Sequence, residues 1–185
     1  MVDRLKIFLS IALLCFSAYS QADSSSDFED GEHLFRTAGG YGCSTCHGMY
    51  AQGGGNVGGN IRGKSLEDIN TVLDNEPTMK LLSEVLNSHK RQLLGNYLTT
   101  LGELPLVEWI IEDKPNQKIV SIDNGQLSQL VILNKLFEPI ELSISPVNPA
   151  SVQIKPYETQ AFQWTPEPGV IQLKFKQSVL EIHIK

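Results

Sequence analysis

The sequence predicts a two-domain protein after an N-terminal leader, an all-α domain followed by a small all-β antiparallel (Ig-like) sandwich. Apolar residues recur at helical spacing in the first half, whereas apolar and polar residues alternate in the second half. A chain of 185 residues has room for one or two domains. We place the leader at residues 1–22, the α domain at 23–114 and the sandwich at 115–185.

The composition is that of a soluble globular protein and excludes several classes. Hydrophobic residues make up 41% of the chain and charged residues 19%, and the mean hydropathy is -0.12. Disordered, fibrous and multi-span membrane proteins have other compositions. The net charge is -6 and no Lys/Arg cluster is present, so we expect no nucleic-acid partner.

Residues 1–22 follow the pattern of a secretory signal peptide. Arg4 and Lys6 precede an apolar run over residues 7–16, and small and polar residues lead to a cleavage site after Ala22 or Ser20. The apolar run is shorter than the roughly 20 residues that span a bilayer, so we expect export to the periplasm rather than a membrane anchor.

The mature chain keeps two cysteines, Cys43 and Cys46, and His47 follows them directly. C-x-x-C-H is the attachment signature of a c-type haem. Two thiols one helical turn apart can add to two vinyl groups of the porphyrin, and the adjacent imidazole can bind the iron. A redox disulfide has no use for the histidine, and a zinc site needs two further paired ligands. We therefore predict one covalent haem c, with Cys43 and Cys46 as thioether anchors and His47 as proximal ligand.

Helices are expected on both sides of this motif. Residues 30–36 predict a short helix with acidic residues in its first turn, and Asn87 is a candidate N-cap for a helix over residues 88–101. An apolar stripe at helical spacing marks the second helix: Leu94, Tyr97, Leu98 and Leu101.

These features together resemble the class I c-type cytochrome family. The resemblance covers residues 26–112 and rests on four segments: Gly31-x-x-Leu34-Phe35, residues 43–48, residues 58–63, and Leu86-Asn87 leading into Tyr97-Leu98. It implies the all-α cytochrome c fold, in which the first and last helices cross. Gly31 is then expected to meet the Leu94–Tyr97 face.

A low-spin electron-transfer haem also needs a ligand on its other face. Met49 is two residues from His47 and cannot readily reach across, and the resemblance implies Met79, in a loop, as the distal iron ligand. His89 is the rival ligand, although it falls in the first turn of a helix whose core face lies elsewhere. A vacant sixth position, which permits ligand sensing or peroxide chemistry, is the third alternative.

The resemblance also implies a partner for the second ring nitrogen of His47. In the family a backbone carbonyl of a Gly-Pro-Asn-Leu-like loop accepts this hydrogen bond, and Gly59 stands in the Pro position here. Arg62 and Lys64 follow in the same region. They either pair with haem propionates or face solvent.

Residues 58–65 match G-x-x-x-x-G-K-[ST], the phosphate-binding loop pattern. That pattern requires a preceding hydrophobic strand, and residues 52–56 are glycine-rich and polar. We expect a loop that ends in a helix cap, with Ser65 capping and Asp68 three residues on, and no nucleotide binding.

Seven short strands are predicted in the second half: residues 118–122, 128–133, 140–145, 152–155, 160–164, 170–176 and 179–184. This half has one histidine and neither cysteine nor methionine, so it lacks the ligands of a blue-copper site. It also offers no nucleophile–base pair. We interpret it as a structural or docking module, with Trp109 and its apolar neighbours expected to pack against it from the haem domain.

The leading hypothesis is a periplasmic, non-enzymatic carrier of single electrons between redox partner proteins, free or as a subunit of a larger oxidoreductase assembly. A haem enzyme or sensor with an open sixth coordination site is the alternative. A structural protein whose two cysteines form a disulfide is the third hypothesis.

Overall fold

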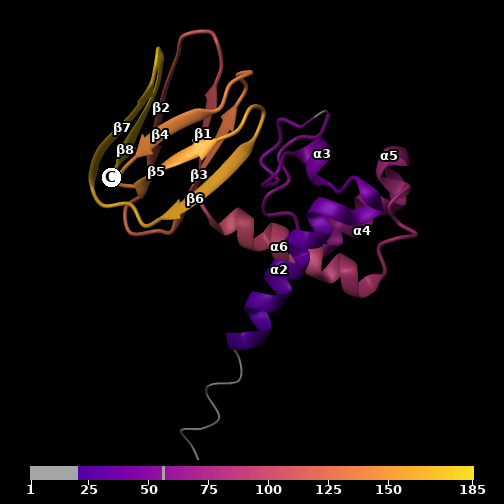
Figure 1. Ribbon diagram of the computed structural model, residues 1–185. Helices are drawn as coiled ribbons and strands as arrows, with labels where there is room; N and C mark the ends of the chain where they lie inside the picture. The colour runs from indigo at the N-terminus through magenta and orange to yellow at the C-terminus, as the bar shows by residue number, and fades with distance from the viewer. Residues whose placement is uncertain (1–20, 56) are drawn as a thin grey trace, which may run out of the picture. The chain divides into compact units, whose positions relative to one another are not determined.

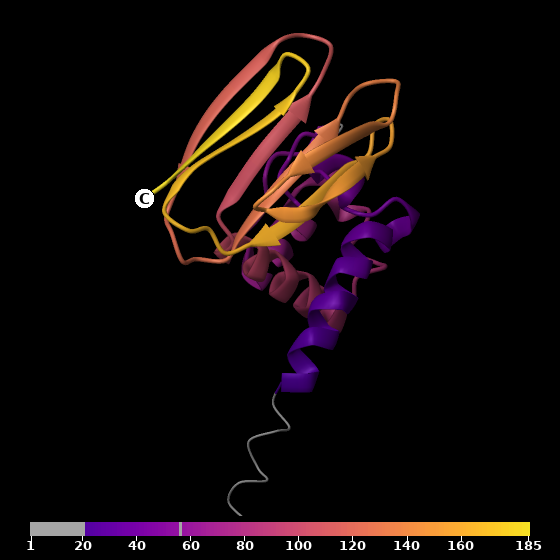
Figure 2. The ribbon, with the colours of Figure 1, turned by 60° about the vertical axis from the view of Figure 1, so that its left-hand side comes forward.

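The computed structural model describes residues 21–55 and 57–185, which divide into two compact units (Figures 1 and 2). The first unit ends at Thr99 and is helical, and the second begins at Thr100 and is dominated by strands. The predicted fold class, helices followed by a β-sandwich, is confirmed. The predicted signal peptide lies outside the described residues, except for Gln21 and Ala22, which begin the first helix.

Among the described residues, six helical segments precede the strands: α2 (Gln21–Thr37), η1 (Ala38–Gly40), α3 (Ser44–His47), α4 (Leu66–Asn75), α5 (Pro77–Lys80) and α6 (Ser88–Glu103). Helix α6 agrees with the predicted helix over residues 88–101, whereas α2 is longer than the predicted segment 30–36. Within the described part of the chain, no helix is long and apolar enough to cross a bilayer.

Helices α2 and α6 meet at Gly31, as expected. A Cβ atom added to Gly31 would lie 2.5 Å from the carbonyl oxygen of Leu93 and 2.7 Å from the Cβ of Tyr97. The ring of Tyr97 packs between two aromatic rings of α2, with centroid distances of 5.1 Å to Phe28 and 5.4 Å to Phe35. The absent side chain of Gly31 therefore permits the close contact between the two helices.

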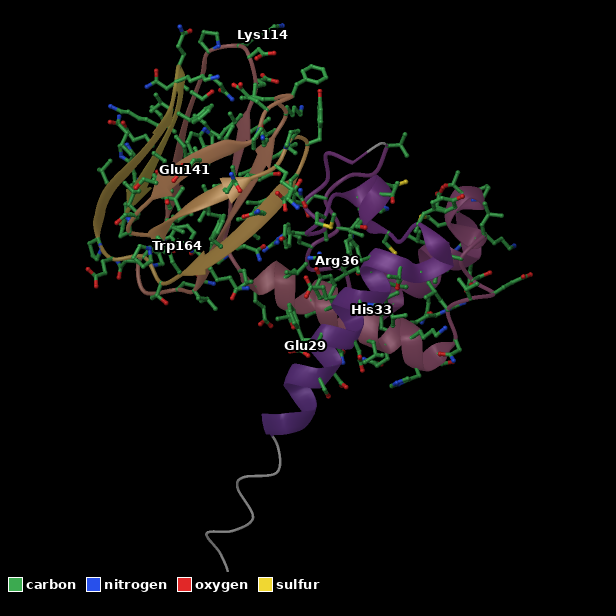
Figure 3. The ribbon with its side chains drawn as sticks, viewed as in Figure 1. Glu29, His33, Arg36, Lys114, Glu141 and Trp164 are labelled. Atoms are coloured by element: carbon green, nitrogen blue, oxygen red, sulfur yellow. The ribbon has the colours of Figure 1, made fainter. Side chains whose placement is uncertain are left out.

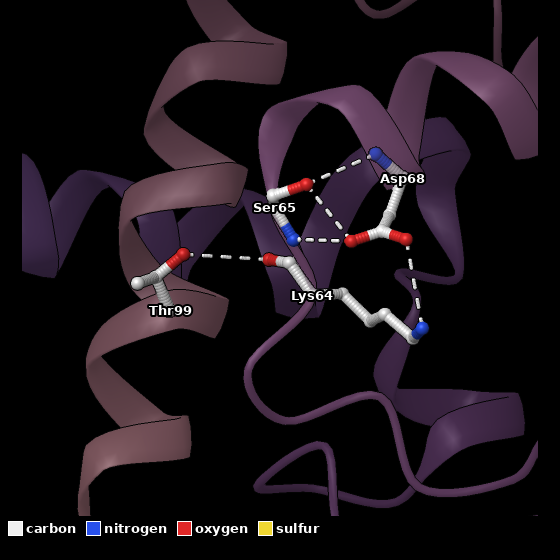
Figure 4. Close-up of polar contacts among 4 residues, drawn as sticks. All are labelled: Lys64, Ser65, Asp68 and Thr99. Carbon is white, nitrogen blue, oxygen red and sulfur yellow. Dashed lines mark hydrogen bonds and ion pairs between the residues drawn. The ribbon is translucent and has the colours of Figure 1, made fainter.

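Helix α4 begins at a complete capping box (Figure 4). The Ser65 hydroxyl accepts from the Asp68 amide at 3.2 Å, and the Asp68 carboxylate accepts from the Ser65 amide at 2.9 Å. The hydrogen bond from the Ser65 backbone lowers the pKa of the Asp68 carboxyl group. The described residues of the glycine-rich segment before Ser65 form no strand, and the capping box follows them, so the prediction of a loop ending in a helix cap is confirmed.

The second unit contains eight strands: β1 (Leu106–Ile111), β2 (Asn116–Ile122), β3 (Ser128–Asn134), β4 (Ile140–Ile144), β5 (Asn148–Ile154), β6 (Thr159–Trp164), β7 (Gly169–Phe175) and β8 (Ser178–Ile184). They form two three-stranded sheets, in the orders β1-β3-β6 and β2-β8-β7, and the two-stranded sheet β4-β5. Inward-facing Val, Ile, Leu and Trp side chains from these strands fill one core.

The expectation of a wholly antiparallel sandwich is wrong. Strand β1 pairs with β3 in parallel, and β2 pairs with β8 in parallel, while the remaining ladders are antiparallel. Alternation of apolar and polar residues shows which face of a strand is buried, but it is the same for either strand direction. The pairing direction therefore could not be derived from that pattern.

The assignment of residues 106–111 to the helical domain is also wrong, because this segment is strand β1 of the sandwich. Every second side chain is buried: Val107, Trp109 and Ile111 are at most 1% exposed and belong to the sandwich core. Trp109 thus packs inside the second unit rather than serving as the expected contact from the haem domain. The period-two alternation of this segment was the signal that should have identified it.

Candidate functional site

Three of the predicted site residues line one cavity of the first unit. The cavity has a volume of about 290 Å³, and Cys43, His47 and Met79 all contribute to its wall. The rest of the wall is largely apolar, with contributions from helices α2, α4 and α6 and from the turn before α6: Phe35, Ile69, Leu73, Leu82, Leu86, Leu94 and Leu98. The structure thus brings together residues that are up to 36 positions apart in the sequence.

His47 is held in one orientation by the loop that follows it. Its Nδ1 atom lies 2.9 Å from the carbonyl oxygen of Gly59, which confirms the predicted acceptor. A carbonyl oxygen can only accept, so Nδ1 carries the hydrogen and Nε2 keeps its lone pair. In this tautomer Nε2 is the ring atom that can bind a metal ion.

Cys43 is the N-cap residue of the short helix α3, and Cys46 lies within that helix. Both thiols are free and half-buried, and the His47 amide donates to the Cys43 carbonyl at 2.9 Å, which closes the turn between them. Cys43 lines the cavity, whereas Cys46 does not belong to its wall. Burial raises the pKa of the Cys43 thiol to about 11, so the thiol stays protonated at neutral pH.

Glycines pack the following loop against the motif. A Cβ atom on Gly58 would lie 2.6 Å from His47 Nδ1 and 2.6 Å from the Cys46 carbonyl oxygen, and one on Gly55 would lie 2.3 Å from that same oxygen. The Gly58 amide donates to the Cys46 carbonyl at 2.8 Å. Side chains at these positions would force the loop away from the imidazole, so the glycines keep the Gly59 carbonyl within reach of it.

Met79 contributes to the same cavity as His47, but its backbone conformation differs from the prediction. It is part of the short helix α5, which begins at Pro77, rather than of a loop. Pro at the first helical position favours a turn here, which explains the difference. Met79 is half-buried in the cavity wall, whereas Met49 is 37% exposed and His89 is exposed, and neither of them lines the cavity.

The two basic residues of the loop have polar contacts of different kinds. Lys64 lines the cavity and forms an ion pair with Asp68 at 3.6 Å, and more than half of its side chain is exposed. Arg62 donates from Nη1 to the Tyr50 carbonyl at 3.3 Å. Asp68 and Glu76 also line the cavity, and the sequence analysis did not place them there.

The apolar cavity wall was only partly foreseen. Leu82 and Leu86 were not expected at the site, although they are four residues apart, which is the spacing of neighbours on a helix. The segment that carries them is mostly turn, which explains why no long periodic run marked it. Among the described residues, no group of three or more His, Cys, Asp or Glu side chains could hold a metal ion.

The second unit lacks the side chains of a blue-copper centre. Residues 100–185 contain His183 as their one histidine and have no cysteine or methionine. The His183 Nε2 atom lies 2.6 Å from the carboxylate of Glu181, its neighbour on the same face of β8.

No protein-family profile matches the sequence, and no curated protein is similar enough to be matched. Among solved structures, an apo copper-binding protein matches with a TM-score of 0.34 and 9% identity, over 43% of this chain and 86% of that chain. A copper(I) amicyanin variant matches with a TM-score of 0.30 and 12% identity, over 44% and 82% of the two chains. A haem-copper terminal oxidase matches with a TM-score of 0.31 and 15% identity, over 44% and 60%.

Proposed function

We propose that this protein is a periplasmic c-type cytochrome that carries single electrons between redox partner proteins through one covalently bound haem. Cys43 and Cys46 are the thioether anchors, His47 is the proximal ligand and Met79 is the distal ligand. The observation that carries the proposal is the shared cavity of Cys43, His47 and Met79.

The chemistry of the donor set fits this group. Two free thiols precede an imidazole whose Nδ1 hydrogen is taken by the Gly59 carbonyl, which leaves Nε2 as the donor to iron. The close approach of Gly58 to this imidazole leaves no room for another side chain. The leucine-rich wall suits the apolar body of a porphyrin, and Met79 supplies the thioether sulfur of a Met/His pair.

The chain performs three tasks in the proposed electron transfer. When bound, the haem iron supplies the chemistry by cycling between the ferric and ferrous states. The Gly59 carbonyl fixes the His47 ring, so that a ligand does not have to reorient when the charge on the iron changes. The apolar wall would exclude water from a bound haem, and Met79 would supply a thioether ligand to its iron.

Covalent attachment can be tested on mature protein from its native host. We expect one haem that stays with the polypeptide in denaturing electrophoresis, and loss of covalently attached haem in the Cys43→Ala/Cys46→Ala double variant. Protein without iron or covalent haem would refute the proposal and select the hypothesis of a structural protein.

The distal ligand can be tested by absorption spectroscopy of the ferric protein. We expect the weak band at the red edge of the spectrum that accompanies Met ligation, and its loss in Met79→Ala. Met49→Ala is the matched control and should keep the band, because Met49 does not line the cavity. A high-spin spectrum in the unmodified resting protein would instead support the alternative, a haem enzyme or sensor with an open sixth site.

A further inference from the structure

The second unit has a cavity of its own, which the proposed electron transfer does not use. Its volume is about 640 Å³, within the range of ligand pockets. Its wall includes Ser145 and Pro146 after β4, Trp164 at the end of β6, and the first four residues of β7, Gly169–Gln172. Trp164 and Lys114 lie at opposite ends of the sandwich in Figure 3.

Trp164 contributes to this wall and carries a covered hydrogen-bond donor that has no partner. The side chain is only 7% exposed, and its buried indole Nε1 has no hydrogen-bond partner. A buried N–H without an acceptor costs free energy, and most buried polar groups in proteins are paired. A ligand that offers a carbonyl oxygen would remove this cost.

Strand β7 supplies an unpaired backbone edge beside the same cavity. It forms a ladder with β8 alone, and β4 forms one with β5 alone. Cα atoms of β4 and β7 approach within 8 Å, yet no ladder joins the two strands. Gly169, Val170 and Gln172 are exposed, with Val170 62% exposed. An open strand edge of this kind accepts another extended chain by backbone hydrogen bonding.

The charge of the wall favours a basic ligand. Glu167 is the one ionisable side chain among the lining residues of this cavity. The rest of the wall is apolar or uncharged, and it includes the prolines Pro146 and Pro168. A lysine or arginine near Glu167 would meet an opposite charge and no competing cation in the wall.

We propose that this cavity binds a short, extended, basic segment of a partner protein, which adds as a strand along the first half of β7. A basic side chain of the segment pairs with Glu167, and one of its backbone carbonyls accepts from Trp164 Nε1 once the segment has displaced the atoms that cover this N–H. The second unit is then a peptide-binding module. This proposal does not depend on the haem, so either one can fail without the other.

The first test uses the ¹⁵N-labelled full mature chain and the probe peptide acetyl-Lys-Val-Lys-Val-Lys-Val-amide. Titration should shift the indole resonance of Trp164 and the amide resonances of Val170 and Gln172. The indole of Trp109 is the internal control, because it is also buried without a partner but does not line the cavity. No shift at millimolar peptide, or equal shifts of both indoles, would overturn the proposal.

Matched variants and peptides test the two contacts. Trp164→Phe should weaken binding of the probe at least fivefold, whereas Trp109→Phe, the same change in the same core, should leave it unaltered. Glu167→Gln, at an exposed position, should also weaken binding and does not endanger the core. A peptide with N-methyl groups on alternate residues should not bind, since it cannot pair with a strand edge. Equal binding of that peptide would rule out strand addition and with it the proposal.

Discussion

At the scale of single residues, the hydrogen bond between His47 and Gly59 determines what the imidazole can do. The acceptor residue, Gly59, lies 12 residues after His47, in a loop with no regular structure. The acceptor could be predicted because the resemblance to class I c-type cytochromes implies a backbone carbonyl of this loop as the partner of the ring. The steric role of Gly58 could not, because glycine in a loop is compatible with many arrangements.

The neighbouring glycines 58 and 59 make a matched pair for mutation. Gly58→Ala should lower the free energy of unfolding by about 1–3 kcal/mol, because the new Cβ would lie 2.6 Å from His47 Nδ1 and the Cys46 oxygen. Gly59→Ala should have little effect, since no atom lies within 4 Å of its added Cβ. Urea unfolding of both variants measures the difference. Equal stability of the two variants would contradict the packing described for this loop.

The buried Cys43 thiol predicts a pH dependence of the haem-free protein. Below pH 9 the thiol is protonated in both the folded and the unfolded states, so it contributes fully to stability. Between pH 9.0 and about 11 it ionises only in the unfolded chain, and stability falls, by up to roughly 3 kcal/mol. Unfolding of the haem-free chain across this range should show the loss, and Cys43→Ser, which lacks this thiol, should show a smaller loss. Parallel slopes for both proteins would contradict the prediction.

At the scale of secondary-structure elements, the crossing of α2 and α6 is the contact that orders the first unit. The helix stripe of Leu94, Tyr97, Leu98 and Leu101 was predicted from its spacing, and all four side chains are buried. The length of α2 was not predicted, because residues 21–27 are mostly polar and acidic and carry no apolar period. Local spacing thus identifies a packed face but not the ends of a helix.

Two glycines of these helices should respond differently to alanine. Gly31→Ala should destabilise the protein by about 1–3 kcal/mol, because its Cβ would lie 2.5 Å from the backbone oxygen of Leu93. Gly95→Ala should change stability little, since its contact to Leu66 is looser at 3.1 Å and alanine gains about 1 kcal/mol in helix propensity. Thermal unfolding followed by far-UV circular dichroism compares them. A larger loss for Gly95→Ala would contradict the helix contact.

Among the strands, the sequence predicted position better than pairing. Seven predicted segments coincide with β2 to β8 within a few residues, because alternation of buried and exposed side chains marks each one. The sequence analysis missed strand β1, because β1 follows α6 after only two residues and was interpreted as part of the helical domain. Which strands become neighbours depends on contacts distant in sequence, which alternation does not encode.

At the scale of the whole molecule, the two units have separate hydrophobic interiors. The core of the sandwich consists of residues between Val107 and Ile184, and both tryptophans belong to it. The cavity with Cys43, His47 and Met79 is lined by residues of the first unit alone. The division into a helical and a β domain was predictable because the two periodicities change near one place in the chain.

This separation predicts two unfolding transitions with different sensitivity to the haem. Removing both anchors in Cys43→Ala/Cys46→Ala should destabilise the helical unit, because its apolar cavity loses the proposed occupant. The midpoint of tryptophan fluorescence in urea should stay unchanged, since both tryptophans report on the sandwich. Far-UV circular dichroism of the same samples should show the loss of helix at lower urea. A shift of the fluorescence midpoint would contradict the prediction.

The parallel ladder between β2 and β8 has a consequence for synthesis on the ribosome. β8 is the last strand in chain order, and its ladder with β2 extends to Ile184, after which the Lys185 amide donates to the Ile122 carbonyl. A nascent chain that stops before this segment leaves β2 without a neighbour in its sheet and the core side chains of β8 missing. Closure of the sandwich must therefore wait until translation has passed the final strand, whereas the helical unit is complete some 80 residues earlier.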